Sequence, residues 1–427
     1  MKIFFDVIGC RLNQSEMESI AHVFRALGHR VVSQPADADL AIVNTCAVTV
    51  KAAADSRKKL RRAGRLGARR VVATGCWATL YPRKAMDLAG VTDVVTNQDK
   101  ERLVSNILNL KPEELSTLDL VREPLPGDRS RTRAFIKVQE GCDNRCTYCL
   151  TRLARGKSSS RSMMEIQKDI DIALAGGTKE IVLTGVQLGA WGRDLPGSQD
   201  LGDLISMVLT NSDVQRVRLS SIEPWDIDLR WLCLWQNQRL CRHLHIPLQS
   251  GDDRILRRMG RPITTHSYSR LINSVQNDIP GVALTTDVIV GFPGETENAF
   301  KNSQDFVRRT GFYRGHVFSF SPRPGTAAEK MEDQVPVPLV KKRNATMRQL
   351  FQESGKVFRD QFIGKRRPVL WERSERLENG TWHLSGLSDN YLRIYASAER
   401  DLWNEISTVT IVKHHPQHPA LIAELVP

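Results

Sequence analysis

The 427-residue sequence contains no run of about eighteen apolar residues, which is the length that a membrane-spanning helix needs. Its first residues lack the apolar core of a secretory signal, because Asp6 interrupts the short stretch that begins at Ile3. The ten histidines form no HExxH pattern, so no zinc site of that type is indicated. Together these absences predict a cytoplasmic protein without a membrane segment.

Acidic residues are fewer than basic ones: the sequence has 48 Asp and Glu and 61 Lys and Arg, which gives a net charge of +13. A chain this basic often binds a polyanion, although a scattered solubilising surface would have the same total. The basic residues are clustered, and Arg57–Arg70 holds eight of them in fourteen residues without an acid. We expect phosphate contacts from this segment and from two later clusters, Lys341–Arg343 and Lys365–Arg367.

The chain is too long for one compact core, so two or three domains are expected. Short apolar strands at residues 3–7, 40–43 and 71–74 alternate with helical patterns and predict an N-terminal parallel α/β domain over residues 1–115. The first helix is expected to begin with a capping box formed by Ser15 and Glu18. Residues 111–133 are rich in proline and charge, which is typical of a linker.

Further alternation of strand and helix predicts a parallel sheet curled into a partial (β/α)6 barrel within a domain of residues 131–358. After a long charged helix at 341–360, strand-like segments predict a small antiparallel β-barrel over 359–427. The fold class is therefore α/β with a C-terminal β-barrel. The expected strands of the partial barrel are 135–138, 181–184, 217–221, 243–246, 284–290 and 316–320, and those of the C-terminal barrel are 368–371, 391–395 and 407–412.

Three cysteines on one short loop, Cys142, Cys146 and Cys149 (the core triad), have a C-x3-C-x2-C spacing directly after a predicted strand. Three thiolates can bind three irons of a [4Fe–4S] cubane and leave the fourth iron open to a ligand. Structural zinc is a weaker alternative, because zinc prefers four ligands and no fourth ligand lies nearby in the sequence. Cysteines without a metal are the remaining alternative.

Three other cysteines, Cys10, Cys46 and Cys76 (the N-terminal triad), each follow a predicted parallel strand, at separations of 36 and 30 residues. Since the carboxyl ends of parallel strands meet at one edge of a sheet, these thiols are expected to converge. Each alone would more often be a small buried residue, but three at equivalent positions favour a second metal site. Cys233 and Cys241 lie in an apolar stretch and are expected to be buried in the core.

The C-x3-C-x-aromatic-C loop, with Tyr148 as its aromatic residue, resembles the signature of the radical S-adenosylmethionine (SAM) superfamily. With the N-terminal triad, the chain resembles the methylthiotransferases over nearly its whole length. This family joins an N-terminal domain that carries a second cluster, a radical SAM core and an RNA-binding β-barrel called TRAM. The segments that carry the resemblance are Ile8–Gln14, Asn44–Thr49, Thr74–Cys76, Ser220–Pro224, His245–Gly251, Asp287–Glu295 and Phe320–Thr326.

The resemblance implies that two [4Fe–4S] clusters and two SAM molecules are used to add sulfur and a methyl group at C2 of adenosine 37 in tRNA. The core triad would hold the SAM-cleaving cluster, and the N-terminal triad would hold a second cluster that holds or donates the sulfur. The implied partners are a tRNA anticodon stem-loop, a low-potential electron donor and a sulfur source. A non-catalytic RNA-binding protein with a structural cluster is a further alternative, which the open-iron spacing of both triads disfavours.

Two segments, Gly9–Glu16 and Ser321–Thr326, are most similar to the branch of the family that acts on N6-threonylcarbamoyladenosine. Two sister branches, which act on isopentenyladenosine in tRNA and on an aspartate of a ribosomal protein, are the alternatives. Arg152 stands where the family usually has a proline, and Trp403-Asn404 stands where a glycine turn is usual. The second departure bears on the RNA-binding face of the expected barrel.

The resemblance also implies which residues hold SAM. In the superfamily the residue at the place of Tyr148 lies beside the adenine, although plain loop packing is its alternative role. Gly185 and Gln187 occupy the place where the amino group of SAM binds; the glycine allows a close backbone approach and the glutamine offers a side-chain oxygen. Further candidates lie at the ends of later strands, where either ligand contact or structural hydrogen bonding is expected. These are Glu223, Gln249 and Asp287.

Overall fold

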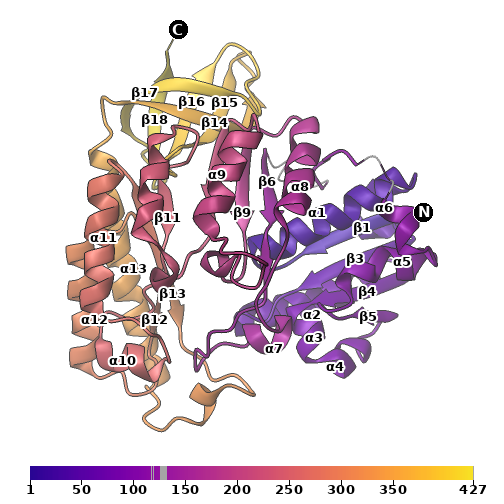
Figure 1. The fold of residues 1–427 in the computed structure, drawn as a ribbon, viewed down its shortest axis with the longest axis horizontal. Coiled ribbons are helices and arrows are strands. Elements are labelled where there is room, and N and C mark those ends of the chain that lie inside the picture. The colour runs from indigo at the N-terminus through magenta and orange to yellow at the C-terminus, as the bar shows by residue number, and fades with distance from the viewer. Residues whose placement is uncertain (117, 119, 126–131, 427) are drawn as a thin grey trace. The chain divides into compact units, whose positions relative to one another are not determined.

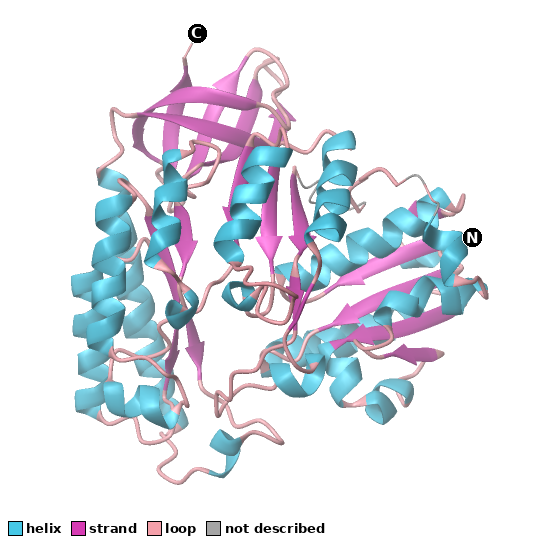
Figure 2. Cartoon of the chain, viewed as in Figure 1, coloured by secondary structure: helices cyan, strands magenta, loops and turns pink. Residues whose placement is uncertain are grey.

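The computed structural model describes residues 1–116, 118, 120–125 and 132–426 (Figure 1). By its internal contacts the chain divides into two compact units. Helices and parallel strands make up most of both, and the second unit also contains a closed β-barrel (Figure 2). The first unit is Met1–Asn144, Cys149–Thr178 and Thr184–Val186; the second is Arg145–Tyr148, Lys179–Leu183 and Gln187–Pro427.

The first unit is built on a five-stranded sheet of order β2-β1-β3-β4-β5, in which every pair is parallel. The three predicted strands are β1, β3 and β4, so the predicted parallel α/β fold of this part is confirmed. The two outer strands are only three residues long, which is too short for a sequence pattern to reveal them. The strands are β1 (Lys2–Val7), β2 (Arg30–Val32), β3 (Leu40–Thr45), β4 (Arg70–Gly75) and β5 (Asp93–Val95).

Helices cover both faces of this sheet because successive side chains of a strand point to opposite sides. On β3, Leu40 and Ile42 pack with apolar residues of α1 and α5, whereas Ala41 and Val43 pack with residues of α2, α3 and α4. A strand buried on both faces reads as a continuous apolar run, as β3 does. The helices are α1 (Arg11–Ala26), α2 (Val50–Arg65), α3 (Cys76–Leu80), α4 (Pro82–Met86) and α5 (Leu103–Leu108).

The predicted capping box at Ser15 and Glu18 is wrong. Helix α1 begins at Arg11, directly after Cys10, so both residues lie inside the helix. The hydroxyl of Ser15 donates to the carbonyl oxygen of Phe135 at 2.6 Å, and Glu18 pairs with Arg122. These two polar side chains therefore bond to residues outside α1 and do not cap the helix.

The described part of the predicted linker is packed rather than open. Helix α6 (Pro112–Ser116) lies within it. Further on, the buried side chain of Arg122 forms an ion pair of 3.3 Å with Glu18, and its backbone N–H donates to Ile172 at 3.2 Å. The rest of the first unit comprises β6 (Arg133–Lys137), β7 (Gln139–Glu140), α7 (Thr151–Arg155), β8 (Ser159–Ser160) and α8 (Met163–Ala175).

The second unit contains two groups of parallel strands, β9 with β10 and β11-β12-β13, and an isolated bridge between Ser221 and His245 connects them. Together with β6, all six predicted strands of the radical SAM-like part are present. Helices α11, α12 and α13 run beside β11–β13 in Figure 1. The elements are β9 (Glu180–Thr184), α9 (Leu201–Asn211), β10 (Arg216–Leu219), β11 (His243–His245), α10 (Asp253–Arg258), α11 (Thr265–Asp278), β12 (Ala283–Val290), α12 (Glu297–Thr310), β13 (Arg314–Ser319) and α13 (Val337–Asp360).

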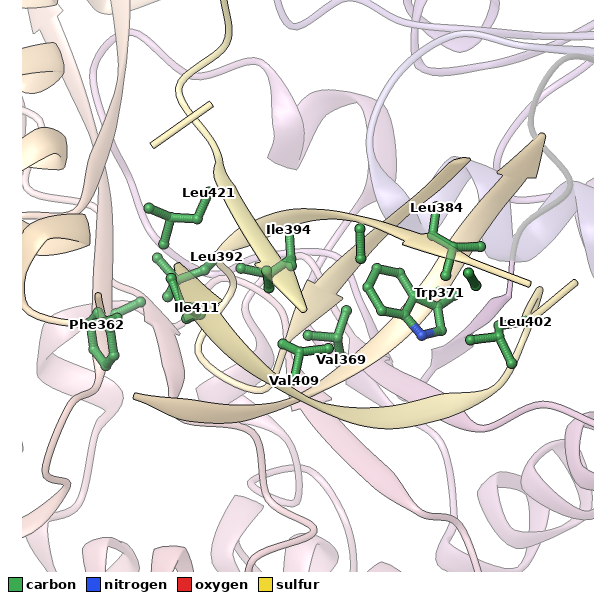
Figure 3. Close-up of a cluster of buried hydrophobic side chains, with 14 of the residues drawn as sticks. Phe362, Val369, Trp371, Leu384, Leu392, Ile394, Leu402, Val409, Ile411 and Leu421 are labelled. Carbon is green, nitrogen blue, oxygen red and sulfur yellow. The ribbon is translucent and has the colours of Figure 1, made fainter. Parts of the chain in front are cut away.

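The C-terminal strands close into a barrel of order β14-β15-β16-β18-β17. Its interior is filled by Trp371, Leu384, Ile394, Val409 and neighbouring apolar side chains (Figure 3). All pairs are antiparallel except β16 with β18, and two of the five strands, β15 and β18, were not predicted. The strands are β14 (Arg366–Arg376), β15 (Trp382–Ser388), β16 (Arg393–Ala398), β17 (Ile406–His414) and β18 (Leu421–Leu425).

The turn at Trp403-Asn404 keeps a glycine-like backbone without a glycine. Asn404 has a φ of 61°, in the left-handed region that asparagine adopts more readily than most residues. Its backbone N–H donates to Trp371 at 2.9 Å, which connects the turn to β14. The departure from the family pattern thus leaves the barrel closed.

The basic clusters are only partly available to a polyanion. On α2, Lys58, Arg61, Arg62 and Arg65 are exposed. By contrast, Arg343 is buried in an ion pair with Glu295 at 2.8 Å, so the expectation that this residue contacts phosphate is wrong. No helix in the described residues is both long and apolar enough to cross a membrane.

Candidate metal centres and cofactor site

The N-terminal triad lies at the carboxyl ends of three neighbouring strands. Strands β1, β3 and β4 are adjacent in the sheet, and in the register Thr45 is opposite Gly75, the residues that precede Cys46 and Cys76. Cys10 is the N-cap of α1, and Cys76 is the first residue of α3. The structure therefore brings the three predicted thiols to one edge of the sheet.

The surroundings of these thiols disfavour thiolates unless a positive charge is nearby. Burial raises the pKa of the Cys46 thiol to about 11; the N–H of Val48 opposes this shift, and the Cys76 and Cys10 thiols add to it. Desolvation likewise raises the pKa of Cys10, and the positive charge of Arg155 opposes that rise. These mutual effects place the three sulfur atoms within electrostatic range of one another.

The three thiols fit a polynuclear cluster better than a single ion. Among the described residues, no group of three or more His, Cys, Asp or Glu side chains is arranged to hold one metal ion. A cubane is wider than one ion, because each of its thiolate ligands binds a different iron, so its cysteines stand further apart. Three thiols at the ends of adjacent strands match that requirement.

The core triad lies on a loop whose first half is held close to the segment before β8. Gly141, with a φ of 70°, lies where a Cβ atom would be 1.8 Å from the carbonyl oxygen of Lys157. The N–H of Cys142 donates to Gly156 at 3.2 Å. At the end of the loop, the sulfur of Cys149 accepts hydrogen bonds from the hydroxyl (3.1 Å) and the N–H (3.4 Å) of Thr151.

The middle of the same loop, which belongs to the second unit, contacts residues at the end of α10. The N–H and hydroxyl of Thr147 donate to the carbonyl oxygens of Met259 (3.0 Å) and Arg258 (2.9 Å), and Thr147 accepts from Ala328. Tyr148 is half-buried, with its ring edge-on to Phe292 at 6.3 Å. These contacts hold the middle of the loop against the residues around Met259 and Ala328.

The predicted SAM residues lie in polar surroundings of different kinds. Buried Gln187 donates to Asp226 at 3.0 Å, and Gly185 is half-buried. Glu223 pairs with Arg261 at 2.7 Å, and the Arg261 guanidinium also lies 4.7 Å from the ring centre of Trp225. Glu223 and Gln187 therefore already form polar contacts with other side chains of the protein.

Gln249 and Asp287 lie side by side on neighbouring segments. The N–H of Gln249 donates to the carbonyl oxygen of Asp287 at 2.8 Å, and the carboxylate of Asp287 is 3.4 Å from His245. Gln249 has a φ of 69° and is only 9% exposed, and its Oε1 has no hydrogen-bond partner among the described residues. A strained, buried residue with an unpaired oxygen is typical of a ligand contact.

Several residues of these sites were not predicted. Arg155, Asn13 and Asn97 surround the N-terminal triad, and Arg261 lies beside Glu223. Because these contacts join segments far apart in the chain, no local pattern reveals them. Cys233 was expected in the core but is exposed, since the short helix that carries it buries Trp231 and Trp235 instead; Cys241 is buried as predicted.

Two family models match the chain. Uncharacterized protein family UPF0004 matches residues 2–97, which contain the N-terminal triad, and the Radical SAM superfamily matches residues 136–307, which contain the core triad. The solved structure of a radical SAM methyltransferase, TsrM from Kitasatospora setae, aligns with a TM-score of 0.57 at 14% identity, covering 77% of this chain and 75% of that one. At this identity the likeness shows the fold. The family model, the fold and the core loop define a radical SAM enzyme.

Comparison with curated relatives identifies the family of radical SAM enzymes to which the chain belongs. A threonylcarbamoyladenosine tRNA methylthiotransferase MtaB from Bacillus subtilis is 34% identical over 96% of this chain and 94% of its own length. A protein of the same name from Thermotoga maritima is 38% identical over 86% of each chain. A tRNA-2-methylthio-N(6)-dimethylallyladenosine synthase from Anaplasma marginale is 31% identical over 93% and 90%. The chain belongs to the radical SAM methylthiotransferase family and uses SAM and [4Fe–4S] chemistry.

Proposed function

We propose that this protein methylthiolates C2 of N6-threonylcarbamoyladenosine at position 37 of tRNA. The observation that carries the proposal is the naming of its relatives: three at 32–38% identity are threonylcarbamoyladenosine enzymes. Relatives named for dimethylallyladenosine are 27–31% identical. Dimethylallyladenosine, also called isopentenyladenosine, is therefore the second candidate substrate, and a ribosomal aspartate is a third.

The core triad is proposed to hold a cluster that binds SAM. When bound, this cluster supplies the electron that splits SAM into methionine and a 5′-deoxyadenosyl radical, which can remove hydrogen from an unreactive C–H bond. Tyr148 would lie against the adenine, and Gly185 with Gln187 would contact the amino group. The unpaired oxygen of Gln249 supports a ligand contact there, and Glu223 with Asp287 completes the proposed set.

The N-terminal triad is proposed to hold a second [4Fe–4S] cluster with one open iron for sulfur. The convergence of its thiols at adjacent strand ends supports this role. The C-terminal barrel and the exposed basic face of α2 are proposed to bind the tRNA backbone. On this proposal the domain limits stay at residues 1–115, 131–358 and 359–427, and the enzyme works in the cytoplasm with an electron donor and a sulfur source.

The decisive experiment is mass spectrometry of tRNA nucleosides from cells with and without this protein. We expect 2-methylthio-N6-threonylcarbamoyladenosine to disappear when the protein is removed and to return when it is restored. Replacing Cys142, Cys146 and Cys149 by Ala should prevent its return and abolish 5′-deoxyadenosine formation. Loss of the dimethylallyl derivative instead would establish the second candidate, and an unchanged nucleoside profile would reject both tRNA substrates.

A further inference from the structure

The end of helix α7 is linked to all three loops that carry the N-terminal triad through the side chains of Asn13 and Asn97. Arg155, the last residue of α7, donates a hydrogen bond to the side-chain oxygen of Asn13. The amide of Asn13 in turn donates to Ile8 at 2.9 Å and to Thr45 at 3.5 Å, next to the strand ends that lead into Cys10 and Cys46. Through Asn13, Arg155 thus joins two of the three loops.

The third loop is joined through the preceding residue of the same helix. The side-chain amide of Asn97 donates to the carbonyl oxygen of Ala154 at 2.8 Å and to the sulfur of Cys76 at 3.7 Å. At the other end of α7, Thr151 donates to the sulfur of Cys149. A helix of five residues therefore contacts the surroundings of both proposed clusters.

Arg155 is held in this place by a buried charge network. Its side chain is 2% exposed and binds both oxygens of Glu16, at 2.8 and 3.2 Å, as well as Glu140 at 2.6 Å. Lys100 pairs with Glu16 at 2.6 Å, and Lys137 pairs with Glu16 and Glu140. A bidentate arginine pair fixes direction as well as distance, so the guanidinium has one orientation.

The buried charge network has an excess of positive charge. Arg155, Lys100 and Lys137 contribute three positive charges and Glu16 and Glu140 two negative ones, which leaves one positive charge. A further carboxylate, Glu101 at 3.9 Å from Lys137, is exposed to solvent and therefore screened. The thiols of Cys10 and Cys76 and the guanidinium of Arg155 lie within electrostatic range of each other.

We propose that Arg155 is a positioning residue for the N-terminal cluster: it assembles the three cysteine loops, and its fixed positive charge raises the reduction potential of the cluster. The inference rests on the proposed second cluster. Reduction adds a negative charge to a cluster that three thiolates already make anionic. A buried cation beside it favours the reduced form, because charge, hydrogen bonds and burial set cluster potentials.

The test uses the full chain with Cys142, Cys146 and Cys149 replaced by Ala, so that only the N-terminal cluster remains. In this parent we compare Arg155→Gln, which removes the charge, with Arg155→Lys, which keeps it. Arg152→Gln is the matched control, since Arg152 is half-exposed on the same helix. After anaerobic reconstitution, iron per chain and a redox titration followed by electron paramagnetic resonance are measured.

We expect Arg155→Gln to shift the midpoint potential to more negative values, Arg155→Lys to stay closer to the parent, and Arg152→Gln to match the parent. Loss of iron in Arg155→Gln with retention in Arg155→Lys would also support the role of the charge. An unshifted potential in Arg155→Gln, equal shifts in both variants, or loss of iron in both would overturn it. A parent without iron would instead refute the N-terminal cluster itself, which is a separate failure.

Discussion

Gly141 and Gly156 show how two glycines of similar φ differ in what surrounds them. Their φ values are 70° and 77°. A Cβ atom at Gly141 would be 1.8 Å from the carbonyl oxygen of Lys157, whereas a Cβ atom at Gly156 would have no neighbour within 4 Å. Alanine at Gly156 therefore meets only backbone strain, and alanine at Gly141 must also push apart the loop before Cys142.

This difference predicts the behaviour of the two alanine variants. Gly156→Ala should lower the free energy of unfolding by about 1–3 kcal/mol, the cost of forcing alanine into a backbone conformation that essentially only glycine adopts, and should keep its iron. Gly141→Ala should reduce both iron per chain and 5′-deoxyadenosine formation, because the core loop is displaced. Equal activity of the two variants would contradict a role for this close approach.

His22 makes stability depend on pH. It is buried on α1, and burial, together with the charges of Arg122 and Arg25, lowers its pKa from 6.5 to about 4. The unfolded chain therefore binds a proton on this residue at a higher pH than the folded chain does. The stability that comes from keeping His22 neutral is fully present above pH 6.5. As the pH falls towards 4, the free energy of unfolding decreases by roughly 3 kcal/mol in total because of this residue.

We expect His22→Asn to weaken this loss of stability between about pH 7 and about pH 4.5. Urea unfolding midpoints measured at several pH values, compared between the variant and the wild-type protein, give the difference directly. His266→Asn, at an exposed histidine, is the control and should follow the wild-type curve. If the difference between His22→Asn and wild type does not change with pH, His22 is not the titrating group.

Among the elements, the C-terminal barrel is attached to β9 and β10 by buried charges. Glu180 is fully buried and pairs with Arg218 at 2.7 Å and with Arg216 at 2.8 Å. The two guanidinium groups also donate to the carbonyl oxygens of Leu387, Ser388 and Asp389 at the end of β15. Deleting the barrel would therefore leave two buried arginines without these acceptors, so point variants are a cleaner test of its function than truncation.

Replacing Glu180 should strongly reduce the stability of the protein, because it removes the carboxylate that pairs with both arginines. Glu180→Gln keeps the shape of the side chain but leaves both arginines without a counter-charge, and we expect a loss of about 3–5 kcal/mol in the free energy of unfolding. Glu372→Gln, which breaks the more exposed pair with Arg393 on the barrel, should cost less than about 1 kcal/mol. Similar losses in denaturant unfolding would show that burial does not distinguish the two pairs.

At the scale of the whole molecule, the net charge is +13, and several of the basic side chains that contribute to it are exposed together on one face of α2. Replacing Lys58, Arg61, Arg62 and Arg65 together by Gln should weaken anticodon stem-loop binding. It should also reduce the salt slope by up to about 0.7 log unit per tenfold salt for each phosphate that the variant no longer neutralises. Arg70→Gln is the control, because Arg70 is already paired with Asp93 at 2.8 Å. An unchanged slope in the fourfold variant would exclude this face.

Much of the fold was predictable because its signals are local. The buried strands β3 and β4 appear as continuous apolar runs, and the amphipathic pattern of α1 locates that helix. The short strands β2 and β5 could not be predicted, since three residues carry too little pattern and depend on a neighbouring strand. Strands β15 and β18 were missed because the pairing that closes the barrel is a non-local event.

The sequence by itself determined where both triads lie. Cys142, Cys146 and Cys149 are close because one short loop carries them, and the N-terminal cysteines converge because parallel strands end at one edge. Only the tertiary structure decided what surrounds them: it placed Arg155 beside Asn13 and buried Arg343, which looked like a free cation. The physical reason is that strand ends and loop spacings follow from local chain geometry, whereas the burial and pairing of a charge depend on segments that meet only after the chain has folded.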